Sequence, residues 1–442
     1  MIRQWRSGSG DRAVVIAFVG LILVVVGLVH FYLWKRLVRD PLRPGWGRRV
    51  GGAVAVGLAV LLPATLIRAR TGHAEWLAWP GYLWLALMFY LLVTLVPLEI
   101  LRAAVLLLWR SRRRTAEKVL IASGSAAGEG ESGTADSARG EGESRTAGRA
   151  GESSDAGESG GAEDVAERAG VERRLVLARG MAIFAGLTAA GITGYGVKTA
   201  LGPPQINRWA MPMSKLPRGM DGTRLVVVSD IHLGPLAGTH HVGRIVDLIN
   251  SVKADMVCVV GDLVDGTVAE LGRFATPLAD IESRYGAYFV TGNHEYYSGY
   301  APWVEEVARL GVKPLRNERV EINGLDLAGV NDLGGAQYGD APDFAKALGD
   351  RDTTRPVVLM AHQPLAAHQA APFGVDLQVS GHTHGGQMAP FNLLVKLQQP
   401  VVSGYGNVDG VPVFVTNGAG TWGPPVRVGA PPQVTVIELR SV

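Results

Sequence analysis

Four long apolar runs before residue 200 constrain the fold of this chain more than any other feature. They are Ala13–Trp34, Val50–Ile67, Leu77–Leu98 and Gly180–Val197. A run of about 18 or more apolar residues is long enough to cross the bilayer core as a helix, and prolines such as Pro63 are tolerated there. The sequence therefore predicts an all-α membrane region of about four helices, three of them within residues 1–110. The alternative is a set of buried helices in a soluble domain.

Composition favours the membrane interpretation. Only 19% of the residues are charged, whereas a soluble domain usually has about 25%. The net charge of +3 comes from arginines that cluster beside the apolar runs. That placement fits the cytoplasmic faces of a membrane protein better than a nucleic-acid groove, so no nucleic-acid partner is expected.

The fourth run and the segment before it have a distinct character. Residues 111–172, and above all 122–170, are rich in Gly, Ala, Ser and Glu, with few large apolar residues. Such a segment buries too little surface to fold, and a disordered cytoplasmic loop is predicted. Residues 173–198 then form either an ordinary fourth membrane helix or a twin-arginine-like signal anchor that starts at Arg173-Arg174. Both interpretations give the same topology.

After a connector at 199–218, residues 219–442 show an α/β pattern. Short β-branched runs alternate with amphipathic stretches. The expected strands are Arg224–Val228, Met256–Val260, Ala287–Thr291, Pro356–Met360, Leu377–Ser380, Val411–Thr416 and Gln433–Leu439, and the expected helices are Val242–Val252 and Tyr300–Leu310.

Five polar clusters directly follow five of these strands. They are Asp230-Ile-His232, Gly261-Asp262-Leu-Val-Asp265, Gly292-Asn-His-Glu295, Ala361-His362-Gln-Pro364 and Gly381-His-Thr-His384. In α/β sheets, ligands bind outside the carboxyl ends of the strands. Each cluster alone is more often structural than functional, but five in this arrangement indicate one shared site.

The side chains in the clusters are typical metal ligands. Two Asp, one Asn and four His can converge, and this mixture of carboxylate and imidazole suits Mn, Fe or Zn rather than Mg or Ca. Seven ligands are too many for one such ion. They suffice for two divalent ions that share a bridging carboxylate, with a bridging water activated as the nucleophile of an in-line displacement.

The motifs resemble those of the calcineurin-like metallophosphoesterase superfamily, and in detail its bacterial membrane-associated phosphodiesterase branch of YkuE and YaeI type. The resemblance covers roughly Leu216–Leu439. The motifs that carry it are Ser229-Asp-Ile-His-Leu-Gly234, Gly292-Asn-His-Glu-Tyr-Tyr297, Gly381-His-Thr-His-Gly-Gly-Gln387 and Gly420-Thr-Trp-Gly-Pro-Pro425. The implied fold is a two-sheet sandwich flanked by helices.

The resemblance also implies a role for each residue. Asp262 should bridge the two metals, His294 should act as the catalytic acid or stabilise charge on the phosphate, and Asp265 should orient a ligand. No other cofactor is implied. The first metal would be held by Asp230, His232 and His384, and the second by Asn293, His362 and His382.

One departure from a sister branch bears on the substrate. Protein phosphatases of this superfamily have Asp-Arg-Gly after the second cluster, whereas Asp265 is followed by Gly266 and Thr267. The missing arginine argues against a phosphoprotein substrate. Arg427 could grip the phosphate instead, or it could be a solvated surface residue. His240, His241 and His368 lie outside the motifs, where a place on the surface or a role in supporting a ligand is expected rather than catalysis.

The predicted function is membrane-anchored hydrolysis of a phosphodiester, pyrophosphate or monoester. The anchor suggests a lipid headgroup ester as substrate. The alternative is a non-catalytic membrane module, which loss of Asp262 or His294 would mark. A transporter is the third possibility, with only Glu99 and Arg102 near a helix end in its favour. The sequence does not indicate an oligomeric state.

The distribution of basic residues predicts the topology. The loop between the first two runs holds six, against three before the first run. Short basic loops stay in the cytoplasm. The loop between the first two runs and the basic linker should therefore be cytoplasmic. Four crossings then make the chain a multi-pass protein of the cell membrane and place the catalytic domain outside the cytoplasm.

Overall fold

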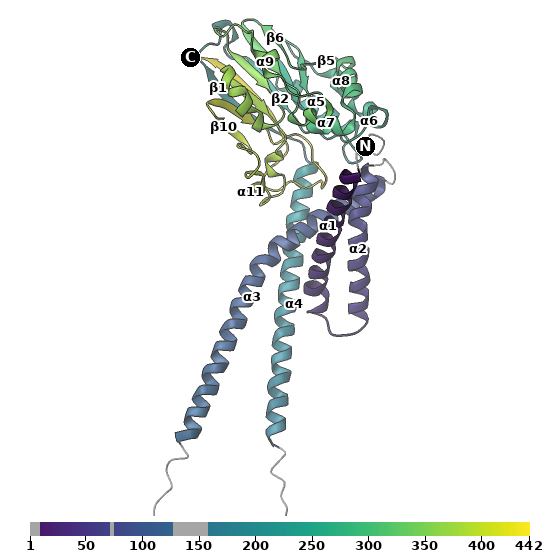
Figure 1. The fold of residues 1–442 in the computed structure, drawn as a ribbon, viewed down its shortest axis with the longest axis vertical. Helices are drawn as coiled ribbons and strands as arrows, with labels where there is room; N and C mark the ends of the chain where they lie inside the picture. Colours follow the sequence, from purple (N-terminus) through teal and green to yellow (C-terminus); the bar gives the residue numbers. More distant parts are fainter. Residues whose placement is uncertain (1–8, 71–74, 127–157) are drawn as a thin grey trace, which may run out of the picture. The chain divides into compact units, whose positions relative to one another are not determined.

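The structure, a computed structural model, describes residues 9–70, 75–126 and 158–442 (Figure 1). Two compact units make up the chain. The larger comprises Met1–His30, Val56–Tyr90 and Ala190–Val442, and the smaller comprises Phe31–Ala55 and Leu91–Ala189. Each is described here by itself.

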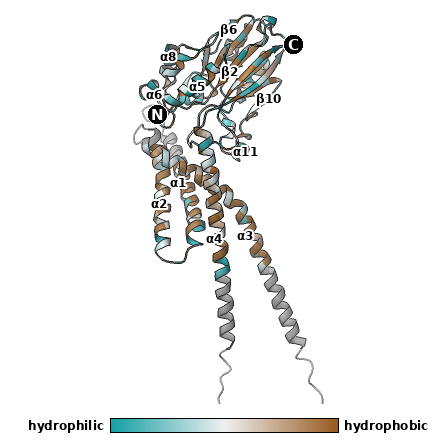
Figure 2. Ribbon diagram, turned by 180° about the vertical axis from the view of Figure 1, so that it is seen from behind, coloured by the Kyte–Doolittle hydropathy of each residue, from teal (hydrophilic) through white to brown (hydrophobic). Residues whose placement is uncertain are grey.

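Four long helices precede the α/β domain. They are α1 (Ser9–Trp34), continued by the π-helical turn η1 (Lys35–Arg39), α2 (Trp46–Arg70), α3 (Ala78–Ala126) and α4 (Glu158–Leu201). Each contains a stretch long and apolar enough to cross a membrane: Val19–Arg39, Trp46–Ile67, Ala78–Trp109 and Glu172–Leu201. Hydrophobic residues, brown in Figure 2, make up most of these stretches. The prediction of about four apolar helices is confirmed.

The helices extend further than predicted. Residues 111–126 and 158–172 were expected to be disordered, but α3 continues to Ala126 and α4 begins at Glu158. Residues 111–126 include three Ala and three Arg, and residues 158–172 include three Ala and four Glu, all of which have high intrinsic helix propensity. The rest of the expected loop, 127–157, lies outside the described residues. Glu99 consequently lies within α3, where it pairs with Arg36 at 2.6 Å and Arg102 at 3.1 Å.

The α/β domain consists of two six-stranded sheets. The first has the order β1-β12-β2-β3-β4-β5 and the second β10-β11-β9-β8-β7-β6. The strands of the first sheet are β1 (Gln205–Met213), β2 (Arg224–Val228), β3 (Met256–Val260), β4 (Ala287–Val290), β5 (Val312–Pro314) and β12 (Gln433–Ser441). Those of the second are β6 (Glu318–Ile322), β7 (Leu325–Gly329), β8 (Val357–Met360), β9 (Leu377–Ser380), β10 (Gly404–Val408) and β11 (Val411–Val415).

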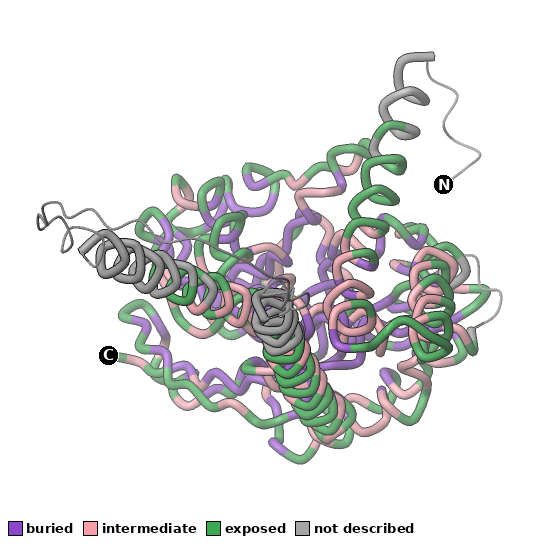
Figure 3. Tube along the Cα trace, turned by 90° about the horizontal axis from the view of Figure 1, so that it is seen from below, coloured by how far each residue is buried: buried purple, intermediate pink, exposed green. Residues whose placement is uncertain are grey.

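The sheets pack face to face, with helices on both outer faces. Alternation along β2 sends Leu225 and Val227 into the core between the sheets and Val226 and Val228 toward the helices. The first sheet is covered by α5 (Thr239–Ser251), α6 (Val268–Ala275) and α8 (Tyr300–Arg309), and the second by α9 (Phe344–Leu348) and α10 (Ala367–Ala370). In Figure 3, which colours the chain by burial, the buried segments of the domain are purple and the long helices are mostly exposed or half-buried. The predicted two-sheet sandwich flanked by helices is confirmed.

The domain begins earlier than the predicted boundary at residue 219. Strand β1 lies in the expected connector and pairs in parallel with the whole of β12, from Gln205 opposite Gln433 to Met213 opposite Ser441. Pro212 within the strand is tolerated because β1 is an edge strand. The proline and the weak apolar alternation hid this strand from sequence analysis.

Candidate metal centre

The predicted ligands all lie just beyond strand ends. Asp230 follows β2, Asp262 follows β3, and Asn293 starts the short helix α7 (Asn293–Ser298) after β4. In the second sheet, His362 follows β8, and His382 and His384 follow β9. Strands β2, β3 and β4 are parallel, as are β8 and β9, so within each sheet these ends share one edge.

Five of the seven ligands have left-handed backbone conformations. Their φ angles are 53° at Asp230, 50° at His232, 52° at Asp262, 71° at His382 and 52° at His384. A non-glycine residue in this region costs on the order of 1 kcal/mol or more. Such strain in one cluster indicates that the turns aim side chains at a common point, because stability alone would favour glycine there.

The first group consists of Asp230, His232 and His384. The Nε2 atoms of the two histidines face each other at 3.0 Å, and Asp230 Oδ1 lies 3.3 Å from His384 Nε2. All three side chains are buried. Three ligand atoms converge within 4.8 Å of one another, a spacing that suits one cation.

The second group consists of Asp262, His362 and His382, with Asn293 beside them in the chain turn after β4. The ligand atoms of Asp262, His362 and His382 also lie within 4.8 Å of one another. Asn293 Oδ1, His362 Nε2 and His382 Nδ1 are buried and have no hydrogen-bond partner. An unpaired buried polar atom costs about 1–3 kcal/mol. A cation would satisfy all three, so the residues fit a metal ion.

One carboxylate oxygen faces both groups. Asp262 Oδ2 lies 3.2 Å from His362 Nε2 in the second group and 3.9 Å from His232 Nε2 in the first. It also lies 4.0 Å from His294 Nε2. A ligand shared by two cations would occupy such a position.

Asp265 fixes two of the three histidines that face this oxygen, His232 and His294. Its Oδ1 accepts hydrogen bonds from His232 Nδ1 at 2.8 Å and from His294 Nδ1 at 2.7 Å. The Nε2 atom of each ring is thereby left facing the site. Burial alone would lower the pKa of His294, but the carboxylates of Asp262 and Asp265 raise it to about 9. His294 therefore carries a proton at neutral pH in the protein without cations.

Glu295 has a structural role that the sequence analysis missed. Its buried carboxylate accepts backbone N–H bonds from Asp262 at 2.9 Å, Leu263 at 2.7 Å and Gly292 at 2.5 Å. These bonds clamp the turn after β3 to the turn after β4. The only sequence signal was an acidic residue inside the Gly292–Tyr297 motif.

Arg427 differs from both interpretations offered for it. The side chain is fully buried, so it is neither solvated nor free to grip a phosphate. Its guanidinium donates to the carbonyls of His384 at 2.8 Å and Asn417 at 2.9 Å, and its Nη2 lies 3.2 Å from His384 Nδ1. Arg427 thus holds the His384 turn in place. A lone arginine in a loop gives no sequence signal for such bonds.

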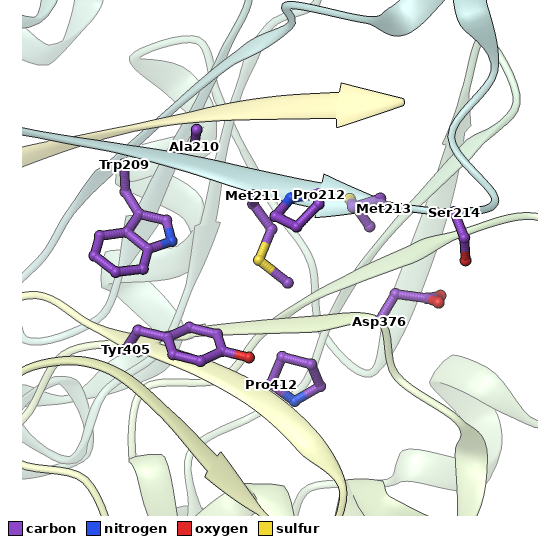
Figure 4. Close-up of a pocket in the computed structure, with 9 residues that line it drawn as sticks. All are labelled: Trp209, Ala210, Met211, Pro212, Met213, Ser214, Asp376, Tyr405 and Pro412. Carbon is purple, nitrogen blue, oxygen red and sulfur yellow. The ribbon is translucent and has the colours of Figure 1, made fainter. Parts of the chain in front are cut away.

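A separate pocket of about 450 Å³ lies beside β1 (Figure 4). Trp209 and Tyr405 stack at its wall with ring centroids 5.8 Å apart. The other lining residues are Ala210, Met211, Pro212, Met213, Ser214, Asp376 and Pro412. None of the nine belongs to the predicted metal ligands, so this pocket is distinct from the metal centre.

Comparison with known proteins finds similar chains. Residues 223–386 match the family described as calcineurin-like phosphoesterase. The chain is 37% identical to a Danio rerio transmembrane protein with metallophosphoesterase domain, over 59% of this chain and 62% of that protein. It is 36% identical to an uncharacterized metallophosphoesterase of Helicobacter pylori, over 61% of this chain and 72% of that protein. It is 29% identical to the uncharacterized metallophosphoesterase YkuE of Bacillus subtilis, over 59% of this chain and 94% of that protein. The match thus spans less than two thirds of the Danio rerio protein.

Proposed function

This chain belongs to the calcineurin-like metallophosphoesterase family, and on that premise we propose that it is a membrane-anchored, metal-dependent hydrolase of phosphate esters. The observation that carries the proposal is the position of Asp262 Oδ2 between two groups of buried ligands, 3.2 Å from His362 and 3.9 Å from His232.

The ligand sets divide between two divalent ions. Asp230, His232 and His384 would hold one, Asn293, His362 and His382 the other, with Asp262 shared. Two such ions, when bound, supply charge stabilisation for the phosphoryl group and lower the pKa of a coordinated water to near neutrality. The mixture of imidazole and carboxylate suits Mn, Fe or Zn.

His294 is the proposed general acid. Its Nδ1 is tied to Asp265, and its Nε2 lies 4.0 Å from Asp262 Oδ2 at the edge of the cluster. A proton on Nε2 can pass to the leaving oxygen of the ester as the P–O bond breaks. The ring is partly exposed, with 15% of its side chain accessible, so a substrate can reach it.

The substrate is a phosphodiester, pyrophosphate or monoester, with a lipid headgroup ester favoured by the four apolar helices. An arginine after Asp265 is absent, which disfavours a phosphoprotein. We place the catalytic domain outside the cytoplasm, because the six basic residues between the first two apolar runs and the basic linker belong on the cytoplasmic side.

The proposal is tested with the purified full-length protein in detergent. A chelator should abolish hydrolysis of bis(p-nitrophenyl) phosphate, and added Mn²⁺ should restore it. Asp230→Asn should stay inactive after Mn²⁺ is added, whereas the control Asp409→Asn, at an exposed carboxylate, should behave as wild type. Hydrolysis that persists without metal, or that Asp230→Asn retains, would refute the proposal.

A further inference from the structure

A short segment beyond the last ligand exposes an unusual density of large apolar side chains. Phe391 is 44% exposed, Leu393 60%, Leu394 57% and Leu397 84%. The segment includes α11 (Asn392–Val395) and begins seven residues after His384. Exposed apolar side chains scattered singly are ordinary, but four within seven residues mark a contact surface.

Two contacts within the larger unit place the Phe391 segment and the Trp422 loop beside the first part of α3. The rings of Phe391 and Phe89 meet edge to face with centroids 6.5 Å apart. In the loop at Trp422, a Cβ placed on Gly423 would lie 3.7 Å from Tyr82 Cε1. Phe89 and Tyr82 both belong to Ala78–Trp109, one of the stretches apolar enough to cross a membrane. The surface therefore adjoins a helix whose own surroundings would be lipid.

The same loops border the metal centre. The Gln387 side chain donates to the Trp422 carbonyl at 3.0 Å and accepts from the Trp422 N–H at 3.0 Å, which joins the two loops. The Trp422 ring lies 6.1 Å from the His294 ring and is 56% exposed. One boundary of the site is thus formed by residues that continue into the exposed apolar segment.

We propose that Phe391–Leu397 inserts into the surface of the bilayer, so that the metal centre takes phosphate esters of lipids whose acyl chains remain in the membrane. Apolar side chains next to a lysine, here Lys396, are typical of segments that lie at the headgroup boundary. The lipid as substrate rests on the proposed hydrolase function, whereas the insertion does not.

Insertion is tested directly with a fluorescent probe. The chain has a single cysteine, Cys258, which is buried, and burial raises the pKa of its thiol. A nitrobenzoxadiazole probe can therefore be attached specifically at Leu397→Cys or at the control Val442→Cys, whose side chain is 76% exposed. In full-length protein reconstituted in phosphatidylcholine vesicles, the probe at 397 should shift to the blue and be quenched by doxyl-labelled lipid, and the probe at 442 should not.

Other outcomes at 397 overturn the proposal. Emission typical of water would show that the segment is solvated. A blue shift without quenching by doxyl lipid would show that a protein surface, such as a second copy of this chain, covers it. Both results are read without any activity measurement.

The substrate class is tested with two chromogens that share a leaving group. One is bis(p-nitrophenyl) phosphate in water, and the other is a dioleoyl phosphatidyl-p-nitrophenol in the vesicle. Leu393→Asp/Leu397→Asp should lose at least about tenfold in kcat/KM on the lipid, because a carboxylate resists insertion, and change little on the soluble ester. Val442→Asp should affect neither. Equal activity of the double variant and the wild type on the lipid would overturn the proposal, whereas no wild-type hydrolysis of either ester would refute the hydrolase function alone.

Discussion

Asp265 couples the binding and the catalytic parts of the site at the scale of single residues. One of its oxygens accepts from both His232 and His294, at 2.8 and 2.7 Å. The first histidine lies with Asp230 and His384 in the first ligand group, and the ring of the second lies 6.1 Å from that of Trp422. A single carboxylate therefore sets the direction in which both Nε2 atoms point.

His294→Gln should separate catalysis from metal binding. The variant keeps an amide of similar reach but cannot donate a proton as an acid, so turnover should fall by about 10²–10⁴-fold. Metal content, measured by inductively coupled plasma mass spectrometry, should match that of the wild type. Loss of one metal equivalent would instead make His294 a ligand.

Glu295→Gln should destabilise the domain, although Glu295 is not itself a predicted metal ligand. Gln replaces one acceptor oxygen by an NH₂ group that faces backbone N–H donors, and the loss should be about 2–3 kcal/mol in the free energy of unfolding. Chemical denaturation measures it. The control Glu305→Gln, on the exposed face of α8, should be neutral, and equal stability of both variants would contradict the proposed clamp.

His241 should make stability depend on pH. Burial, Arg244 and His240 lower its pKa to about 4, below the value of about 6.5 for the unfolded chain. The unfolded state then binds more protons between these values, so the free energy of unfolding should be greatest above about pH 6.5 and fall as the pH drops toward about 4. His241→Gln should reduce this fall in denaturation curves. An identical pH profile for the two proteins would exclude the effect.

The residue types of the site were predictable from sequence because each ligand directly follows a strand. Asp230, Asp262 and His362 lie beyond runs of four or five buried residues that a sequence pattern reveals. The supporting bonds of Glu295 and Arg427 were not predictable. They join segments that are far apart in the chain, and no local pattern records such pairing.

At the scale of elements, burial on both faces decided which strands could be recognised. Strands β2, β3, β8 and β9 are almost wholly buried, and their apolar runs predicted them to within a residue. Strand β1 is exposed along most of its length and contains Pro212, and β10 alternates half-buried and exposed positions and contains two glycines. Their pairing with β12 and β11 is a tertiary effect, which propensity alone does not indicate.

Strand β1 should therefore be required for a stable isolated domain. A fragment that begins at Gly219 lacks the strand and leaves β12 as an unpaired edge. It also loses the buried side chains of Met211 and Met213, each worth about 1.5–3 kcal/mol. Compared with a fragment that begins at Gly202, it should melt at least about 5 °C lower in a thermal scan. Equal melting temperatures would show that β1 is dispensable.

At the scale of the whole molecule, the described residues contain four helices apolar enough to cross a membrane and one α/β domain, which together indicate a membrane-associated protein. The side of the membrane on which the α/β domain lies can be tested directly. A reporter that works only in the cytoplasm should be inactive when fused after Val442 and active when inserted after Arg43, between α1 and α2, because short basic loops stay inside. Activity at Val442 would overturn the proposed orientation.

The central claim is that one carboxylate joins two metal ions in a hydrolytic site, and metal content tests it most directly. Purified full-length wild type and the control Asp409→Asn should each contain two metal ions per chain by inductively coupled plasma mass spectrometry. Asp262→Asn should hold fewer than one and lose turnover, because its Oδ2 faces both ligand groups. If Asp262→Asn retained two metal ions and normal turnover, the account of the site would be wrong.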